Sequence, residues 1–212
     1  MSEAITIHLE GTDCSGKSSI AKLFPGYTGM QWEVRRGSIL ASGENATLII
    51  AKSLAENKAI PAEIIGDLFV AAVQEDIERY TSPVNNVLQD SLTILRSAAY
   101  HSVSGVPRIG ELMIDLLPSF PRFTNSFYLT VDLESRRTRL DARSQTGTQA
   151  MTTTDNLMLS NPETFIKIDG ILQDLAVVHF KAGIIDTSHM MPNEIAAHIA
   201  RITGILDSAE VN

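Results

Sequence analysis

The chain has a single cysteine, Cys14, and no long apolar run. One cysteine excludes an internal disulfide, which fits a reducing compartment. No window reaches the roughly 18 uninterrupted apolar residues of a membrane span. The N-terminus, MSEAITIHLEG, also lacks a charged region followed by a long apolar stretch. We therefore expect a cytoplasmic protein that has no membrane partner.

The chain also has fewer basic than acidic residues. The 17 Lys and Arg residues face 25 Asp and Glu residues, which gives a formal net charge of −8. Proteins that coat nucleic acid usually need a broad basic surface, so nucleic acid is excluded as a partner. The five histidines and Cys14 lack the spacing of zinc ligands. The tetrapeptide Asn-Lys-x-Asp, by which GTPase switches read guanine, is absent as well.

Short apolar runs alternate with segments of helical periodicity along the whole chain. The runs predict strands at residues 5–10, 30–34, 84–90, 127–131 and 183–186. The intervening segments predict helices at residues 17–24, 44–57, 61–80, 91–101, 134–143, 162–181 and 192–206, with Pro25 and Gly26 breaking the first. Strands separated by such helices favour βαβ crossovers and a parallel sheet. We expect one α/β domain over residues 1–212, a three-layer fold with about five parallel strands flanked by helices.

A glycine-led loop joins the first predicted strand to the first predicted helix. Residues 11–18, GTDCSGKS, match the pattern Gly, four residues, Gly, Lys, Ser. Such a loop directs backbone N–H groups and the positive end of a helix dipole toward one point, where phosphate binds. We predict a site for ATP and Mg²⁺, in which Lys17 reaches the β and γ phosphates and Ser18 is the metal ligand. The predicted cofactor-binding residues are Gly11, Thr12, Asp13, Cys14, Ser15, Gly16, Lys17, Ser18 and Ser19. A fortuitous Gly-rich turn is the alternative.

The sequence around this loop resembles the thymidylate kinase family of nucleoside monophosphate kinases. Residues 5–24, ITIHLEGTDCSGKSSIAKLF, are similar to the family's opening strand and Glu-Gly-x-Asp-Gly-x-Gly-Lys loop, with cysteine in place of the glycine at position 14. Residues 126–143 resemble the strand and arginine-bearing helix before the family's lid, and residues 182–202 resemble its closing strand and helix. The resemblance implies a P-loop kinase fold, ATP-dependent transfer of phosphate to a thymidylate-like nucleoside monophosphate, and a homodimer packed through helices.

The resemblance also assigns roles to a basic helical segment. Arg136, Arg139 and Arg143 are spaced by three and four residues, so they share one face of the predicted helix. By resemblance, Arg139 and Arg143 are catalytic residues that reach the donor phosphates when a lid at residues 136–155 closes. A solvated basic face is the alternative. Residues 144–155, SQTGTQAMTTTD, are polar and predict a mobile segment.

The family's acceptor motifs are altered in this chain. Its Asp-Arg-Tyr motif corresponds to Asp90, Ser91 and Leu92, so the arginine is missing. Residues 69–74, FVAAVQ, lack the arginine of Phe-Ala-Ala-Asp-Arg, and residues 34–38, VRRGS, retain Arg35 and a glycine of Arg-Glu-Pro-Gly-Gly. Three possibilities follow: a nucleoside monophosphate acceptor, a nucleoside or nucleoside-like acceptor, and a catalytically silent nucleotide-binding relative.

Two carboxylates are candidate catalytic residues. Asp90, at a predicted strand end, would lie near Mg²⁺ or take a proton from an acceptor hydroxyl, or it would cap the following helix. Asp13 has a family counterpart near the acceptor site, or it braces the loop. For Cys14, the start of a helix predicts a lowered thiol pKa, which bound phosphates would oppose.

Four further residues are candidates for the acceptor side. Arg96, one or two helical turns after Asp90, would supply a replacement for a missing family arginine. Tyr100 would stack on an acceptor base or simply pack. Glu10 and Arg35 complete this predicted substrate set.

Overall fold

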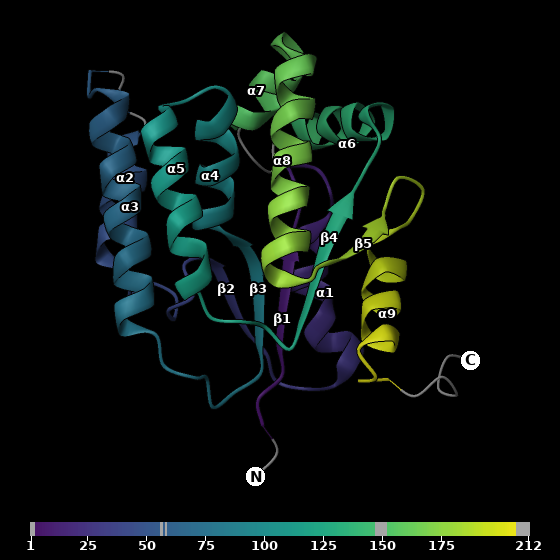
Figure 1. The fold of residues 1–212 in the computed structure, drawn as a ribbon. Coiled ribbons are helices and arrows are strands. Elements are labelled where there is room, and N and C mark those ends of the chain that lie inside the picture. Colours follow the sequence, from purple (N-terminus) through teal and green to yellow (C-terminus); the bar gives the residue numbers. More distant parts are fainter. Residues whose placement is uncertain (1–2, 56, 58, 147–151, 207–212) are drawn as a thin grey trace.

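The computed structural model describes residues 3–55, 57, 59–146 and 152–206. Within them, five strands form one parallel sheet in the order β2-β3-β1-β4-β5. The strands are β1 (Thr6–Glu10), β2 (Glu33–Gly37), β3 (Val87–Leu92), β4 (Asn125–Thr130) and β5 (Gly183–Asp186). Because all strands run the same way, their carboxyl ends meet at one edge of the sheet (Figure 1). The predicted α/β fold is confirmed.

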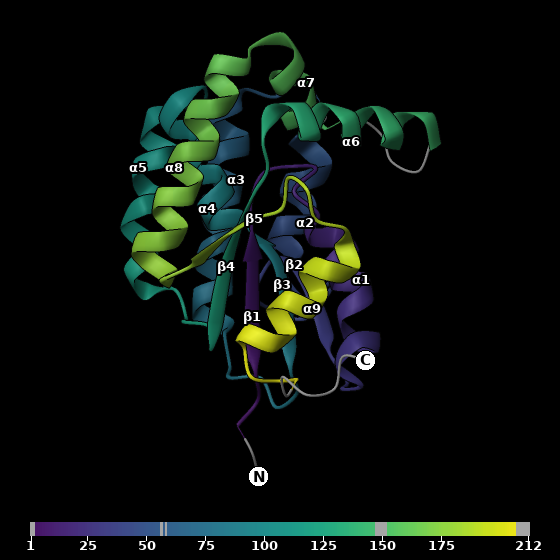
Figure 2. The ribbon, with the colours of Figure 1, turned by 90° about the vertical axis from the view of Figure 1, so that its right-hand side faces the viewer.

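Helices cover both faces of the sheet. They are α1 (Lys17–Thr28), α2 (Ala46–Ala55), α3 (Ala62–Arg79), α4 (Thr93–Val103), α5 (Pro107–Leu116), α6 (Leu133–Thr146), α7 (Thr153–Ser160), α8 (Pro162–Phe180) and α9 (Pro192–Ile202). Helices α1 and α9 lie on one face, and α3, α4, α5 and α8 lie on the other (Figure 2). None of the helices in the described residues is long and apolar enough to cross a membrane.

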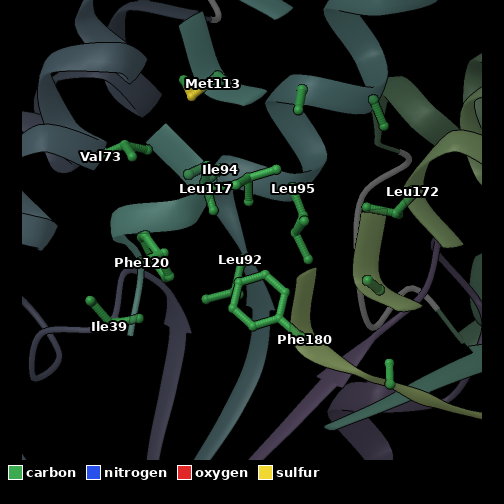
Figure 3. Packing of buried hydrophobic residues seen from close by; sticks show 14 of the residues in the cluster. Ile39, Val73, Leu92, Ile94, Leu95, Met113, Leu117, Phe120, Leu172 and Phe180 are labelled. Atoms are coloured by element: carbon green, nitrogen blue, oxygen red, sulfur yellow. The ribbon is translucent and has the colours of Figure 1, made fainter. Parts of the chain in front are cut away.

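The buried hydrophobic residues on the two faces of the sheet form two large clusters. Ile7 and Leu9 are fully buried against α1 and α9, where Ile20 and Ile199 contribute. The larger cluster lies on the other face and includes Leu95 of α4, among others (Figure 3). Strand β1 is therefore packed through Ile7 and Leu9 and paired on both sides with β3 and β4, and the loop starts from the end of this central strand.

Helix α1 runs through Pro25, contrary to the predicted break. Phe24 is fully buried and packs its ring edge to face on Trp32, with 5.1 Å between centroids. The hydroxyl of Thr28 donates to the carbonyl of Phe24 at 3.1 Å. Tertiary packing thus outweighs the hydrogen bond that proline cannot make. The helix ends at Gly29, whose φ of 63° is left-handed.

Other elements of the structure also differ from the predicted ones. Strand β2 occupies Glu33–Gly37 rather than residues 30–34, because it pairs with β3 from Glu33 onward. Helix α5, Pro107–Leu116, had not been predicted at all. Part of the segment predicted to be mobile is helix α7, whose start is a capping box of Thr152 and Asp155. Residues 147–151 of the predicted lid lie outside the described residues.

Candidate active site

The loop between β1 and α1 is shaped by two glycines. Gly11 has a φ of 141° and Gly16 a φ of 99°. A Cβ on Gly11 would lie 2.6 Å from the carbonyl oxygen of Leu129, so the neighbouring strand leaves no room for a side chain. Cys14 also has a left-handed φ, 63°, which is uncommon outside glycine and accounts for the glycine of the resembling family at this position.

Lys17 lies inside the loop with its ammonium group bound to backbone. Its Nζ donates to the carbonyls of Gly11 at 2.6 Å and Thr12 at 2.9 Å, and to the hydroxyl of Ser15 at 3.2 Å. Burial, and then the charge of Arg96, lower the pKa of Lys17. The loop therefore concentrates a positive charge at the N-terminus of α1, where the helix dipole also favours an anion.

The side-chain oxygens of Ser18 and Asp90 form a hydrogen-bonded pair beside the loop, and both are of the type that coordinates metal ions. The Ser18 hydroxyl donates to Asp90 Oδ2 at 3.0 Å. Burial raises the pKa of Asp90, but Lys17 and Arg36 outweigh burial and hold it below its usual range, so the carboxylate is ionised at neutral pH. Mg²⁺ prefers such oxygen ligands and keeps several waters, so two protein donors suit it. Asp90 does not cap α4, because the N-cap is Leu92 and has no side-chain cap hydrogen bond.

Arg36 bridges this donor pair, whereas the predicted Arg35 does not enter the cleft. Arg36 donates to Asp90 Oδ2 at 2.7 Å and to the Ser18 hydroxyl at 2.7 Å. Arg35 pairs instead with Glu33 at 2.8 Å and donates to the carbonyl of Ile39. Arg36 rather than Arg35 lines the cleft because neighbouring residues of a strand point to opposite faces, and Arg36 is the register partner of Asp90.

Glu10, Asp13 and Arg96 form a charged cluster under the loop. The guanidinium of Arg96 lies 3.5 Å from Glu10 Oε1 and donates to Asp13 Oδ1 at 3.2 Å and to the Gly11 carbonyl at 3.1 Å. Glu10 is fully buried and accepts the backbone N–H of Leu92 at 2.9 Å. Burial raises the pKa of Asp13, but Arg96 and Lys17 outweigh it and hold the pKa well below its usual range. The cluster fixes the loop against α4.

Helix α6 reaches the loop with the predicted arginine face. Arg136 is almost fully buried, and it donates to the Thr12 hydroxyl and to the Asp13 carbonyl at 2.5 Å. Arg139 donates to the Cys14 carbonyl at 3.2 Å and to the carbonyl of Thr187. Arg136 is therefore not part of a solvated basic face. Arg139 lies at the wall of the cleft.

The start of α7 closes over the same loop. Arg143 pairs with Asp155, and the Thr152 hydroxyl donates to Asp13 Oδ2 at 2.7 Å. Asp13 is thereby hydrogen-bonded to Arg96 of α4 and to Thr152 at the start of α7, which is the arrangement expected if Asp13 braces the loop. Cys14 is half-buried near these groups, and burial raises the pKa of its thiol. The predicted lowering of the thiol pKa was wrong, because burial raises it, the carboxylates of Asp155 and Asp13 add to this rise, and Arg143 offsets only part of it.

A single cleft of about 1310 Å³ runs from the loop to α2, α3 and α4. Drug-sized ligands occupy pockets of roughly 300–1,000 Å³, so this cleft has room for more than one such ligand. The loop and α6 border its first half. The second half has an apolar wall that includes Ile65, Phe69 and Tyr100, and it also exposes Arg36, Lys52 and Arg96.

The described structure has the fold of thymidylate kinases. A thymidylate kinase from Candida albicans superimposes with a TM-score of 0.66 at 14% identity, covering 95% of this chain and 92% of the other. A thymidylate kinase from Ehrlichia chaffeensis gives a TM-score of 0.60 at 15% identity, covering 96% and 100%. The sequence matches no protein-family model and no curated protein. A nucleotide kinase fold is therefore shown, at a low sequence identity.

Sequence reasoning did not find two cleft residues, Arg36 and Lys52. Arg36 was passed over in favour of Arg35, and only the strand register separates the two. Lys52 lies on α2 outside every recognised motif, and its position beside the end of β2 follows only from the three-dimensional structure. The predicted Glu10, Asp13, Asp90 and Arg96 all gather at the loop.

Proposed function

We propose that this protein is an ATP-dependent kinase that moves the γ-phosphate to a nucleoside monophosphate, with a thymidylate-like acceptor as the first candidate. The observation that carries the proposal is one cleft that joins the Lys17 loop and the Ser18–Asp90 pair to a second half with an apolar wall. Phosphoryl transfer needs an in-line acceptor and a neutralised γ-phosphate, and it asks little covalent chemistry of the protein. The fold shared with thymidylate kinases supports the same reading.

In this proposal Lys17 and the backbone N–H groups of residues 11–16 bind the donor phosphates. Ser18 and Asp90 would hold Mg²⁺, which would supply positive charge to neutralise the donor phosphates. Arg139 and Arg143, at the wall of the cleft, add positive charge on the donor side. Arg36 donates to the Ser18 hydroxyl and to Asp90 Oδ2, so it would compete with the metal for these two oxygens.

The ionisation of the carboxylates favours a phosphate acceptor over a hydroxyl acceptor. A nucleoside hydroxyl needs a general base, and a good base has a pKa near the working pH. The pKa values of Asp13 and Asp90 are both held below their usual range, so both are weak bases. A phosphate oxygen is already deprotonated at neutral pH and needs no base. A nucleoside kinase is therefore the second candidate.

The test is a screen for acceptor-dependent release of ADP. The protein is incubated with ATP and Mg²⁺, and each nucleoside monophosphate and each nucleoside is added in turn. We expect ADP release that depends on a monophosphate and on Mg²⁺. Turnover with nucleosides alone would favour the second candidate. Binding of ATP with no acceptor-dependent release would contradict a kinase and favour a silent relative.

A homodimer and a cytoplasmic location remain predictions from the resemblance and the composition. Sedimentation velocity of the purified chain tests the first of these. A species of twice the chain mass of 23.1 kDa is the expected result.

A further inference from the structure

Lys52 brings an ammonium group to the second half of the cleft. It belongs to α2 and lines the cleft. A Cβ on Gly37, at the end of β2, would lie 3.2 Å from Lys52 Nζ and 3.0 Å from the hydroxyl of Thr93. Gly37 also has a left-handed φ of 78°. The absence of a side chain at this turn therefore leaves room for the ammonium beside the strand end.

The other two cations of this half already have carboxylate partners. Arg36 lies 2.7 Å from Asp90, and Arg96 lies 3.2 Å from Asp13. Within the described part of the chain, no carboxylate oxygen lies within 4.0 Å of Lys52 Nζ. Asp76 is the carboxylate whose charge raises the pKa of Lys52, but it already accepts hydrogen bonds from the Ser38 hydroxyl and from the Asn45 amide. Lys52 therefore supplies a charge that this half of the cleft leaves uncompensated.

The surroundings of Lys52 favour an incoming anion. Burial lowers the pKa of Lys52, and the charges of Arg36 and Arg96 lower it further. A phosphate group placed among these three cations would relieve their mutual repulsion and form charge-assisted hydrogen bonds. The apolar wall that includes Phe69 and Tyr100 lines the same half and suits the flat, less polar part of a nucleotide.

We propose that Lys52, with Arg36 beside it, binds the phosphate of the acceptor and so selects a nucleoside monophosphate over a nucleoside. This inference rests on the proposed function, because it assigns the second half of the cleft to the acceptor. The proposal also explains how this chain could bind an acceptor phosphate without the arginines of the family's acceptor motifs. The arginines missing at residues 69–74 and 91–92 are replaced by cations from β2 and α2.

The test compares binding of matched ligand pairs by isothermal titration calorimetry. The probes are thymidine monophosphate with thymidine and the corresponding adenosine, guanosine, cytidine and uridine pairs. The variants are Lys52→Met, Lys52→Gln and Lys52→Arg, and the control is Lys167→Met, an exposed lysine of α8 outside the cleft. Circular dichroism checks the fold of each. Lys52 makes no hydrogen bond within the described residues, so we expect all variants to fold.

We expect the unmodified protein to bind at least one monophosphate about tenfold or more tightly than its nucleoside. Lys52→Met and Lys52→Gln should reduce that ratio about tenfold by weakening the monophosphate alone, whereas Lys52→Arg and Lys167→Met should keep most of it. An unchanged ratio in either neutral variant overturns the proposal, and so does a failure of every monophosphate to bind at millimolar concentration. The readout is binding, so a protein without kinase activity that shows the predicted ratio refutes the proposed function alone.

Discussion

At the scale of single residues, Lys17 is the group whose charge we expect the proposed donor site to depend on most. Its ammonium lies within the turn of the loop, bound to two carbonyls and a hydroxyl. Lys17→Ala should lower kcat for phosphate transfer by about 100- to 1,000-fold, because one fixed donor to the developing charge is lost. Steady-state kinetics measures the effect, and turnover close to that of the unmodified protein would contradict a phosphate role.

Asp90 should set the requirement for Mg²⁺. Its carboxylate and the Ser18 hydroxyl are 3.0 Å apart and form the donor pair assigned to the metal. Asp90→Asn keeps the shape but removes the charge, so the Mg²⁺ concentration for half-maximal binding of ADP should rise about tenfold or more. Calorimetric titration of ADP at a series of Mg²⁺ concentrations provides the measurement. An unchanged dependence on Mg²⁺ would remove Asp90 from the metal site.

Glu10 should contribute to stability in a manner that depends on pH. Burial raises its pKa, yet His8, Arg96 and Lys17 together lower the pKa below the ordinary 4.5. A carboxylate whose pKa falls on folding stabilises the protein fully above the unfolded value, and this contribution is lost as the pH drops through the folded value. Glu10→Gln should therefore lower the free energy of unfolding by about 3 kcal/mol at pH 7 and weaken the loss of stability below about pH 4.5.

Urea unfolding between pH 3 and pH 7 measures this difference. Glu3→Gln, at an exposed residue before β1, is the matched control and should follow the unmodified protein. An equal loss of stability in both variants at every pH would mean that the Glu10 carboxylate is not held by the cluster. That result would also weaken the assigned role of Arg96, which shares the cluster.

At the scale of the elements, the approach of α3 to α5 depends on a glycine. A Cβ on Gly66 would lie 2.6 Å from Cγ1 of the fully buried Ile109. Gly66→Ala should lower the free energy of unfolding by about 1–3 kcal/mol, because a buried β-branched side chain has little freedom to move. Gly170 of α8 has nothing within 4 Å, so Gly170→Ala should raise stability by about 0.5–1 kcal/mol. Equal effects of the two changes, measured by urea unfolding, would contradict the packing.

Some of these elements are predicted well from the sequence and others are not. β1, the loop and the start of α1 carry an apolar run, a phosphate-loop pattern and a helix, and all three local signals agree. β2 was misplaced because its register with β3 is a long-range pairing that local composition does not reveal. α1 passes Pro25 because burial of Phe24 outweighs proline's intrinsic preference. α7 was missed because a polar composition hid its capping box.

Among the residues of the candidate site, those in local motifs could be predicted from the sequence, and those placed by long-range packing could not. Glu10, Asp13 and Lys17 sit in one short motif, so the sequence alone predicts that they lie together. Asp90 was also predicted, because the carboxyl ends of parallel strands meet at one edge. Arg96 was predicted because it follows Asp90 by one or two helical turns. Arg36 and Lys52 depend on how β2 and α2 are placed against β3, which no local pattern encodes.

At the scale of the whole molecule, the two halves of the cleft belong to different parts of the chain. The loop, α6 and α7 surround the half proposed for the donor, and β2, α2 and α3 surround the half proposed for the acceptor. β3 lies between them in the sheet and carries Asp90, which contacts both Ser18 and Arg36. We infer that donor and acceptor meet over the end of β3, where the metal-binding pair and the acceptor-side cations are in direct contact.

The measurement that tests this account most directly follows the γ-phosphate itself. ATP labelled in the γ position is incubated with the protein, Mg²⁺ and each nucleoside monophosphate, and the products are separated by chromatography. The account predicts label in a nucleoside diphosphate, formed at a rate that Lys17→Ala lowers about 100-fold or more. Label found only in inorganic phosphate, or only in untouched ATP, with every monophosphate tested would contradict it.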